Sequence, residues 1–166
     1  MNAASSFQLK RTVWQSLVIL VLGFWLSGSL LLDGVIIPNL YVSGMMAQPG
    51  FATAGYLIFW NFNRIELLSA ALVLTGVLVL GKTKFAGTHW QRDAVVISML
   101  LLAVSLIDTY LLTPNMCAAG IQLNLFELVA GMSAAMSQLH AGYWVLEVVK
   151  LVAGGVLLSW CFRQSA

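Results

Sequence analysis

Hydrophobic positions along the chain fall into four long runs separated by more polar stretches. The runs cover about residues 13–37, 57–80, 94–113 and 142–162. At about 20 predominantly apolar residues, each run is long enough to cross a hydrocarbon core of roughly 30 Å as a helix. The sequence therefore predicts an all-α fold, a four-helix transmembrane bundle, in a single membrane domain over residues 1–166.

Composition agrees with this prediction. Hydrophobic residues make up 60% of the chain and charged residues 8%, whereas soluble domains carry about 25% charged residues. The net charge is +2 and the basic residues are scattered, so there is no basic patch of the kind that binds nucleic acid. We expect the lipid bilayer to be the main partner of the surface.

The basic residues predict the orientation. Six of them precede the first run, lie between the second and third, or follow the fourth: Lys10, Arg11, Lys82, Lys84, Arg92 and Arg163. The connections 38–56 and 114–141 contain no Lys or Arg. Because cytoplasmic loops carry the excess of basic residues, both termini are predicted to be cytoplasmic. Cys117 and Cys161 then lie at opposite membrane faces, so we expect two free thiols.

The two halves of the chain correspond, which suggests tandem hairpin repeats over about 12–81 and 93–163. Asp33 precedes Pro38-Asn39 in one half, and Asp108 precedes Pro114-Asn115 in the other. Glu66 and Glu147 occupy matching places in the returning helices. A duplication of parallel hairpins explains the match. The alternative is that Pro-Asn commonly ends membrane helices, because proline lacks a backbone donor.

The outer connections are longer than antiparallel neighbours need, since roughly 2 to 8 residues suffice. We therefore expect them to be partly helical. Residues 124–140 have the pattern of a short amphipathic helix. Residues 44–55, which are richer in Gly and Pro, are expected to be less regular.

Charged residues inside the runs gather in the outer half of the membrane. Glu66, Asp108 and Glu147 each lie about 24 Å along a helix from a basic residue at the cytoplasmic end of the same run. A charge in the bilayer interior costs at least about 2.5 to 3.5 kcal/mol, so such residues usually face the bundle and pair. Glu147 and Lys150 are spaced to pair within one helix. Arg64 is expected to contact Asp33, Asp108 or Glu147 of another helix.

Four acidic groups oppose two basic ones if all six are buried together, and an unpaired buried carboxylate takes up a proton rather than stay charged. We expect at least one carboxyl to be protonated and name Glu66. Two interpretations stay open: the charges pair and hold the helices together, or they form a site for an ion, a proton or a polar ligand. The candidate residues are Asp33, Arg64, Glu66, Asp108, Glu147, Lys150, Asn63 and His140.

No catalytic residue, cofactor or metal is predicted. His89 and His140 fall on opposite sides of the membrane, which excludes a two-histidine haem site, and phosphate-loop and nucleophile motifs are absent. A weak metal site at His140, Glu147 and Asp108 is a minor alternative. The aromatic residues near the ends of the runs are expected to form an interfacial belt, as Trp60 and Tyr143 illustrate. Small residues such as Gly28 and Gly154 are expected to allow close helix contacts.

Three stretches in the first half carry a resemblance. Residues 32–38 read LDGVIIP, residues 48–56 read QPGFATAGY and residues 62–66 read FNRIE. This part of the chain resembles small four-helix integral membrane proteins of cyanobacterial type, whose function is unassigned. The resemblance implies a bacterial inner or thylakoid membrane location and implies no catalytic residues.

Three functions are consistent with these patterns. The first is a non-enzymatic accessory or assembly factor for a larger membrane complex. Its expected protein partner is that complex or a second copy of the chain. The second is a small carrier that moves a proton or a solute by means of the outer-half carboxylates. The third is an enzyme acting on a lipid or quinone, which needs a pocket that opens to lipid beside Glu66 or His140.

Overall fold

The computed structural model describes residues 3–45, 48, 50–82, 88–118 and 134–163. The first helical rod comprises α1 (Ala3–Leu31), the π-helical turn η1 (Leu32–Ile36) and α2 (Ile37–Val42). It is followed by α3 (Phe51–Lys82), α4 (Thr88–Ile107) with the π-helical turn η3 (Asp108–Leu112), and α6 (Ala134–Arg163). The described part of the chain contains helices and no strands. The all-α four-helix fold is confirmed.

Four stretches of these helices are long and apolar enough to cross a membrane: Thr12–Val42, Thr53–Gly81, Gln91–Ala118 and Ser137–Arg163. They contain the four predicted runs and extend beyond them. The chain is therefore an integral membrane protein.

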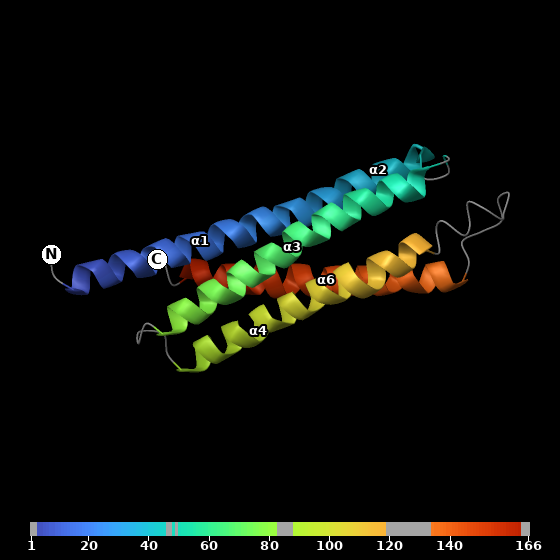
Figure 1. The fold of residues 1–166 in the computed structure, drawn as a ribbon. Helices are drawn as coiled ribbons and strands as arrows, with labels where there is room; N and C mark the ends of the chain where they lie inside the picture. Colours follow the sequence, from blue (N-terminus) through green and yellow to red (C-terminus); the bar gives the residue numbers. More distant parts are fainter. Residues whose placement is uncertain (1–2, 46–47, 49, 83–87, 119–133, 164–166) are drawn as a thin grey trace.

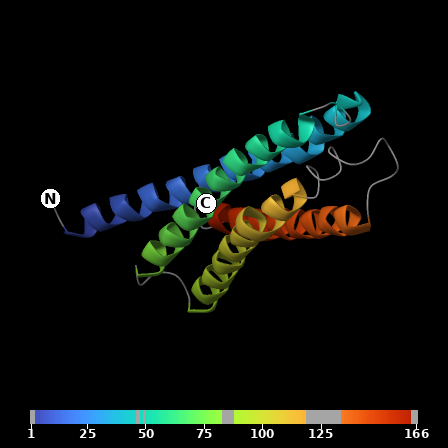
Figure 2. The same cartoon turned by 45° about the vertical axis from the view of Figure 1, so that its right-hand side comes forward.

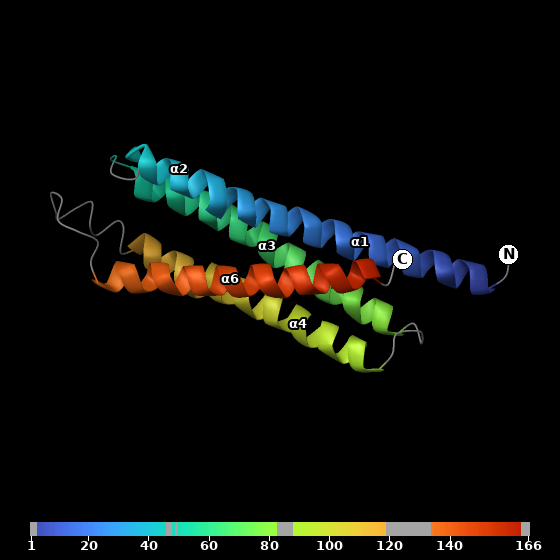
Figure 3. The ribbon, with the colours of Figure 1, turned by 180° about the vertical axis from the view of Figure 1, so that it is seen from behind.

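The helices form a ring in which each packs against two others. Helix α1 packs against α3 and α6, and α4 also packs against α3 and α6. Helices α1 and α3 run side by side in two views (Figures 1 and 2). From behind, α6 lies between α1 and α4 (Figure 3). The start of α1, the end of α3, the start of α4 and the end of α6 share one end of the bundle (Figure 1), so successive helices run in opposite directions.

Each helix turns one stripe inward, with a spacing that alternates between three and four residues, as in left-handed helix bundles. The α3 stripe consists of Asn63, Glu66, Ala70, Val73, Val77 and Leu80. The charged members of every stripe lie toward the α2 end of the bundle, whereas a buried hydroxyl, Ser98 of α4, also lies in the other half. The apolar members lie toward the end that holds the start of α1, and they pack into one hydrophobic core that includes Leu22, Val77, Leu101 and Leu157.

Glycines bring the helices close together in this apolar half. A Cβ atom on Gly76 of α3 would overlap Cγ2 of Val18 on α1, and one on Gly154 of α6 would lie 2.7 Å from Cδ2 of Leu26. Close backbone approach is how membrane helices gain packing energy, since lipid is as apolar as their side chains.

Pro-Asn does not end the helices, which corrects the sequence prediction. Pro38 lies in the first turn of α2, where a missing N–H is tolerated. In the π-helical turn just before it, the Ile37 N–H bonds to the Leu32 carbonyl five residues back. The Asn39 side-chain amide donates to the Val35 carbonyl at 2.7 Å. These bonds satisfy backbone groups around the proline, so the helix continues.

The second half shows the same features at Asp108 and Asn115. The π-helical turn η3 begins at Asp108, where the Thr113 N–H bonds to the Asp108 carbonyl. The Asn115 amide donates to the Leu111 carbonyl at 2.7 Å, and the helix extends through Pro114 to Ala118.

The connection between α2 and α3 is shorter than the expected 38–56 because α3 begins at Phe51. Gly44 and Gly50, at its two ends, have φ of 69° and 85°, a region that glycine enters without strain. The predicted amphipathic helix at 124–140 lies outside the described residues up to 133, and residues 134–140 form the first turns of α6.

Candidate functional site

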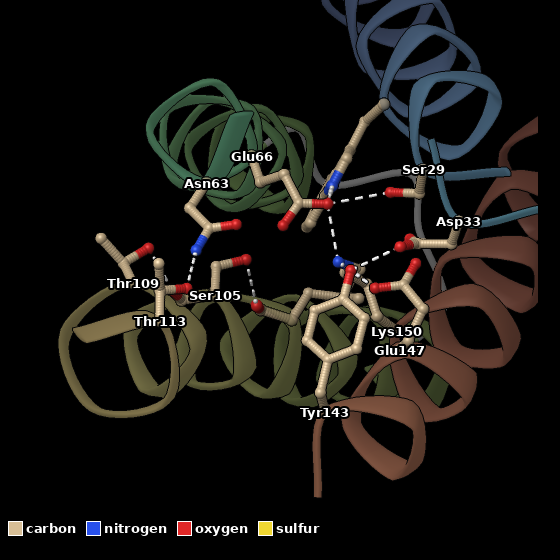
Figure 4. A network of polar contacts seen from close by, with 12 residues as sticks. Ser29, Asp33, Asn63, Glu66, Ser105, Thr109, Thr113, Tyr143, Glu147 and Lys150 are labelled. Carbon is tan, nitrogen blue, oxygen red and sulfur yellow. Dashed lines mark hydrogen bonds and ion pairs between the residues drawn. The ribbon is translucent and has the colours of Figure 1, made fainter. Parts of the chain in front are cut away.

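Four carboxyl groups and one lysine meet inside the bundle, and we call them the axial cluster: Asp33, Glu66, Asp108, Glu147 and Lys150. Each is 4% exposed or less. They come from η1, α3, η3 and α6, so every membrane-crossing segment contributes. Figure 4 shows Asp33, Glu66, Glu147 and Lys150 pointing toward one another.

Lys150 is the cation of the cluster. Its Nζ lies 2.6 Å from Glu66 Oε1 and 2.5 Å from Glu147 Oε2. Glu147 lies one turn earlier on α6, and its contact with Lys150 confirms the pairing that their spacing predicted. The pairing with Glu66 crosses the bundle diagonal from α6 to α3, which places the ammonium near the bundle axis (Figure 4).

Glu66 is the best-satisfied carboxyl. Its Oε1 accepts hydrogen bonds from Lys150 Nζ, from Trp25 Nε1 at 2.9 Å and from Ser29 Oγ at 2.8 Å. Three donors on one oxygen stabilise a carboxylate. The expectation that Glu66 carries the extra proton stays a prediction.

Asp33 is held by a tyrosine. The Tyr143 hydroxyl donates to Asp33 Oδ1 at 2.6 Å, and its ring packs edge-on against Phe59. Tyr143 is 8% exposed, so its predicted place in an interfacial belt is wrong. Its position one turn before Glu147 on α6 instead turns the hydroxyl into the bundle.

Several buried carboxyl oxygens have no hydrogen-bond donor. Both oxygens of Asp108, Oδ2 of Asp33 and both oxygens of Glu147 lack one, although Glu147 Oε2 is in close ionic contact with Lys150. Asp108 interacts electrostatically with Lys150, Glu66 and Asp33. Among the described residues, then, four carboxyls share one ammonium, and leaving such oxygens ionised and bare is costly.

Two of the three remaining candidates, Asn63 and His140, lie on α3 and α6 outside the axial cluster. The Asn63 side-chain amide donates to Thr113 Oγ1 at 2.6 Å and links α3 to the segment after η3 (Figure 4). His140 is partly exposed and lies two turns before Glu147 on α6. Within the described residues, no group of three or more His, Cys, Asp or Glu side chains is arranged to hold a metal ion, which removes the minor metal alternative there.

Arg64 does not join the cluster, which corrects the sequence prediction. The side chain is exposed on the outside of the bundle, and its guanidinium lies 3.5 Å from the centre of the Trp60 ring. The cation that pairs with Glu66 and Glu147 is Lys150. Arg64 and Glu66 are two residues apart, about 200° around a helix, so a helix that points Glu66 inward turns Arg64 outward.

Sequence reasoning missed Trp25 and Ser29, yet a signal was present. Trp25, Ser29 and Asp33 are spaced by four residues and share one face of the first helical rod. On α6, Tyr143, Glu147 and Lys150 are spaced by four and three residues and likewise share one face. A stripe of hydrogen-bonding side chains that includes an acid marks the inward face.

No protein-family model, curated protein or solved structure matches the chain. The site itself defines the class: an integral membrane four-helix bundle whose polar end encloses more acidic than basic groups.

Proposed function

We propose that the chain is a small membrane carrier that moves a proton or a small solute through the axial cluster. The supporting observation is the charge imbalance among the described residues, which bury four carboxyls and one lysine, with carboxyl oxygen atoms that lack donors. A pair of opposite charges is enough to fix helix positions. Further acids add insertion costs of at least about 2.5 kcal/mol each if charged, which a binding role explains and a purely structural role does not.

The corresponding features of the two halves support an internal duplication within this proposal. Each half has a π-helical turn at an acidic residue, a proline that continues the helix, and an asparagine amide bonded four residues back. π-Helical turns are rare and occur often at functional sites. Two independent helices gain all three features less readily than two copies of one hairpin.

The orientation is part of the proposal. The end of the bundle that holds the start of α1 and the end of α6 is assigned to the cytoplasm of a bacterial cell, or of a cyanobacterium with thylakoids, because the basic residues lie there. The axial cluster then lies in the half of the membrane that faces away from the cytoplasm.

Flux measurements in proteoliposomes test the carrier. Glu66→Gln combined with Glu147→Gln keeps the side-chain shapes and removes two acids, so we expect proton flux, followed with an internal pH dye, to fall to the level of empty liposomes. Asp93→Asn is the matched control, because Asp93 is exposed at the cytoplasmic end of α4, and its flux should equal that of the wild type. Undiminished flux in the double variant contradicts the carrier.

A second candidate, an accessory or assembly factor for a larger membrane complex, is favoured by the apolar half of the bundle. Between the axial cluster and the cytoplasmic end, the described core is lined mainly by apolar residues such as Val18, Val73 and Leu157. The buried Ser98 hydroxyl there donates to a carbonyl of its own helix, so these residues form no continuous polar route for a proton in this conformation. This function predicts that purification in a mild detergent recovers the chain with a partner. Repeated recovery of a lone monomer contradicts it.

A further inference from the structure

Two carboxyl groups of the axial cluster face each other inside the bundle. Asp33, on η1, and Glu147, on α6, point toward one another (Figure 4) and interact electrostatically. Asp33 Oδ2 and Glu147 Oε1 both lack a hydrogen-bond donor. The two side chains are 4% and 1% exposed. Ionised, these carboxylates repel in a medium of low polarity, whereas one proton between them turns repulsion into a hydrogen bond.

The groups around the pair do not relieve the repulsion between the two carboxylates. Lys150 touches Glu147 but also holds Glu66, so its one charge is divided between two acids. Tyr143 donates to Asp33 and carries no charge. Asp108 adds a further buried acid within electrostatic range. Of these three described neighbours, Tyr143 is uncharged, Asp108 is acidic and Lys150 is already engaged with Glu66.

We propose that Asp33 and Glu147 form the proton-binding site of the cluster and share one proton in the resting protein. The existence of the shared proton is inferred from the geometry, whereas its role in transport rests on the proposed function. Uptake of a second proton neutralises both acids and releases Lys150 from Glu147. Lys150 keeps Glu66 as its counter-ion, so the cluster gains one positive charge.

Polar side chains lead to the site from one end of the bundle. Tyr143 lies one turn beyond Glu147, and Asn63 and Thr113 form a hydrogen bond between α3 and the segment after η3. The opposite end is closed by the apolar core. The pair therefore exchanges protons with the outer end in this conformation.

Infrared difference spectroscopy of the purified protein in lipid nanodiscs tests the site, because a protonated carboxyl and a carboxylate absorb at separate frequencies. At neutral pH we expect a protonated-carboxyl band that both Asp33→Asn and Glu147→Gln abolish, since each variant leaves one acid beside Tyr143 or Lys150. Asp93→Asn should leave the band unchanged, and Asp108→Asn should remove a different band. A band that survives both pair variants, or separate bands lost one to each variant, overturns the shared proton.

Tyr143→Phe tests the site in a variant that should keep the fold, because the substitution removes one hydroxyl and no charge. Loss of the donor to Asp33 should draw the shared proton toward Asp33 and shift the band, whereas an unshifted band overturns the assignment. The readout is separate from transport. A shared proton found in a protein without proton flux refutes the carrier and leaves the site, and flux without the band refutes the site and leaves the carrier.

Discussion

At the scale of single residues, Lys150 holds the axial cluster together, because its ammonium is the counter-ion of two buried carboxylates. Replacing it with methionine keeps most of the length of the side chain and removes the charge. Breaking a buried pair by removing one partner costs about 3 to 5 kcal/mol. We expect Lys150→Met to lower the free energy of unfolding by that amount, measured by titration with a denaturing detergent in mixed micelles.

The expected loss of stability comes from carboxylates left without a counter-ion, not from lost packing. Removing those carboxylates as well should therefore restore stability. Lys150→Met combined with Glu66→Gln and Glu147→Gln removes the charges together and should recover most of the loss. Arg92→Met is the control, because Arg92 is exposed and such surface changes alter stability by about 0.5 kcal/mol or less. Wild-type stability in the single variant would mean that both acids are already neutral.

Arg64 illustrates the opposite case. Its guanidinium stacks on Trp60 outside the bundle, and an exposed cation–π contact is worth about 0.5 to 1 kcal/mol. We expect Arg64→Leu to cost no more than about 1 kcal/mol in the same unfolding titration. A loss as large as that of Lys150→Met would show that Arg64 compensates a buried acid after all.

The depth of the charged residues could be predicted from the sequence, but their direction could not. Distance along a helix depends only on residue count, and this placed Glu66, Asp108 and Glu147 in one layer. Direction depends on how the helix is rotated, which is decided by packing against its neighbours. The error at Arg64 and the omission of Trp25 have this common origin.

At the scale of the helices, small residues fix how closely α1 approaches α3. A Cβ on Gly76 would overlap Cγ2 of Val18, and a valine side chain has little freedom to move aside. We expect Gly76→Ala to destabilise by about 1 to 3 kcal/mol, the usual cost of overpacking a close-packed core.

Gly155→Ala is the matched control for this prediction. A Cβ there meets nothing within 4 Å, so the substitution should be neutral or slightly stabilising in the same titration. Equal losses in Gly76→Ala and Gly155→Ala would indicate a general intolerance of alanine rather than a close contact between helices.

The π-helical turns explain why the helix ends were predicted too early. The sequence shows that proline lacks a donor, and helices commonly stop for that reason. It does not show that a wider turn and the amide of Asn39 or Asn115 will satisfy the carbonyls around the proline. Those bonds depend on the backbone path itself, so the extension of α2 to Val42 was outside the reach of pattern reasoning.

At the scale of the whole molecule, the number of spans was predictable because it depends on the length and polarity of each run and not on packing. The four helical stretches that are long and apolar enough to cross a membrane contain the predicted runs. The division of the bundle into an apolar half and a polar half was partly predictable as well, since both follow position along the helices. Which acids meet, and how many cations accompany them, required the arrangement of all four helices.

The two cysteines allow the orientation of the bundle to be measured. Cys117 is half-buried near the α2 end of the bundle, whereas Cys161 is buried near the opposite end, and neither forms a disulfide. A membrane-impermeant maleimide added to intact spheroplasts should therefore label Cys117 and leave Cys161 unmodified. Asp93→Cys in a Cys117→Ser background supplies an exposed thiol on the other side without changing the basic residues that set the orientation. We expect this introduced thiol to be labelled only after the membrane is permeabilised, and its labelling in intact spheroplasts would place the axial cluster in the cytoplasmic half instead.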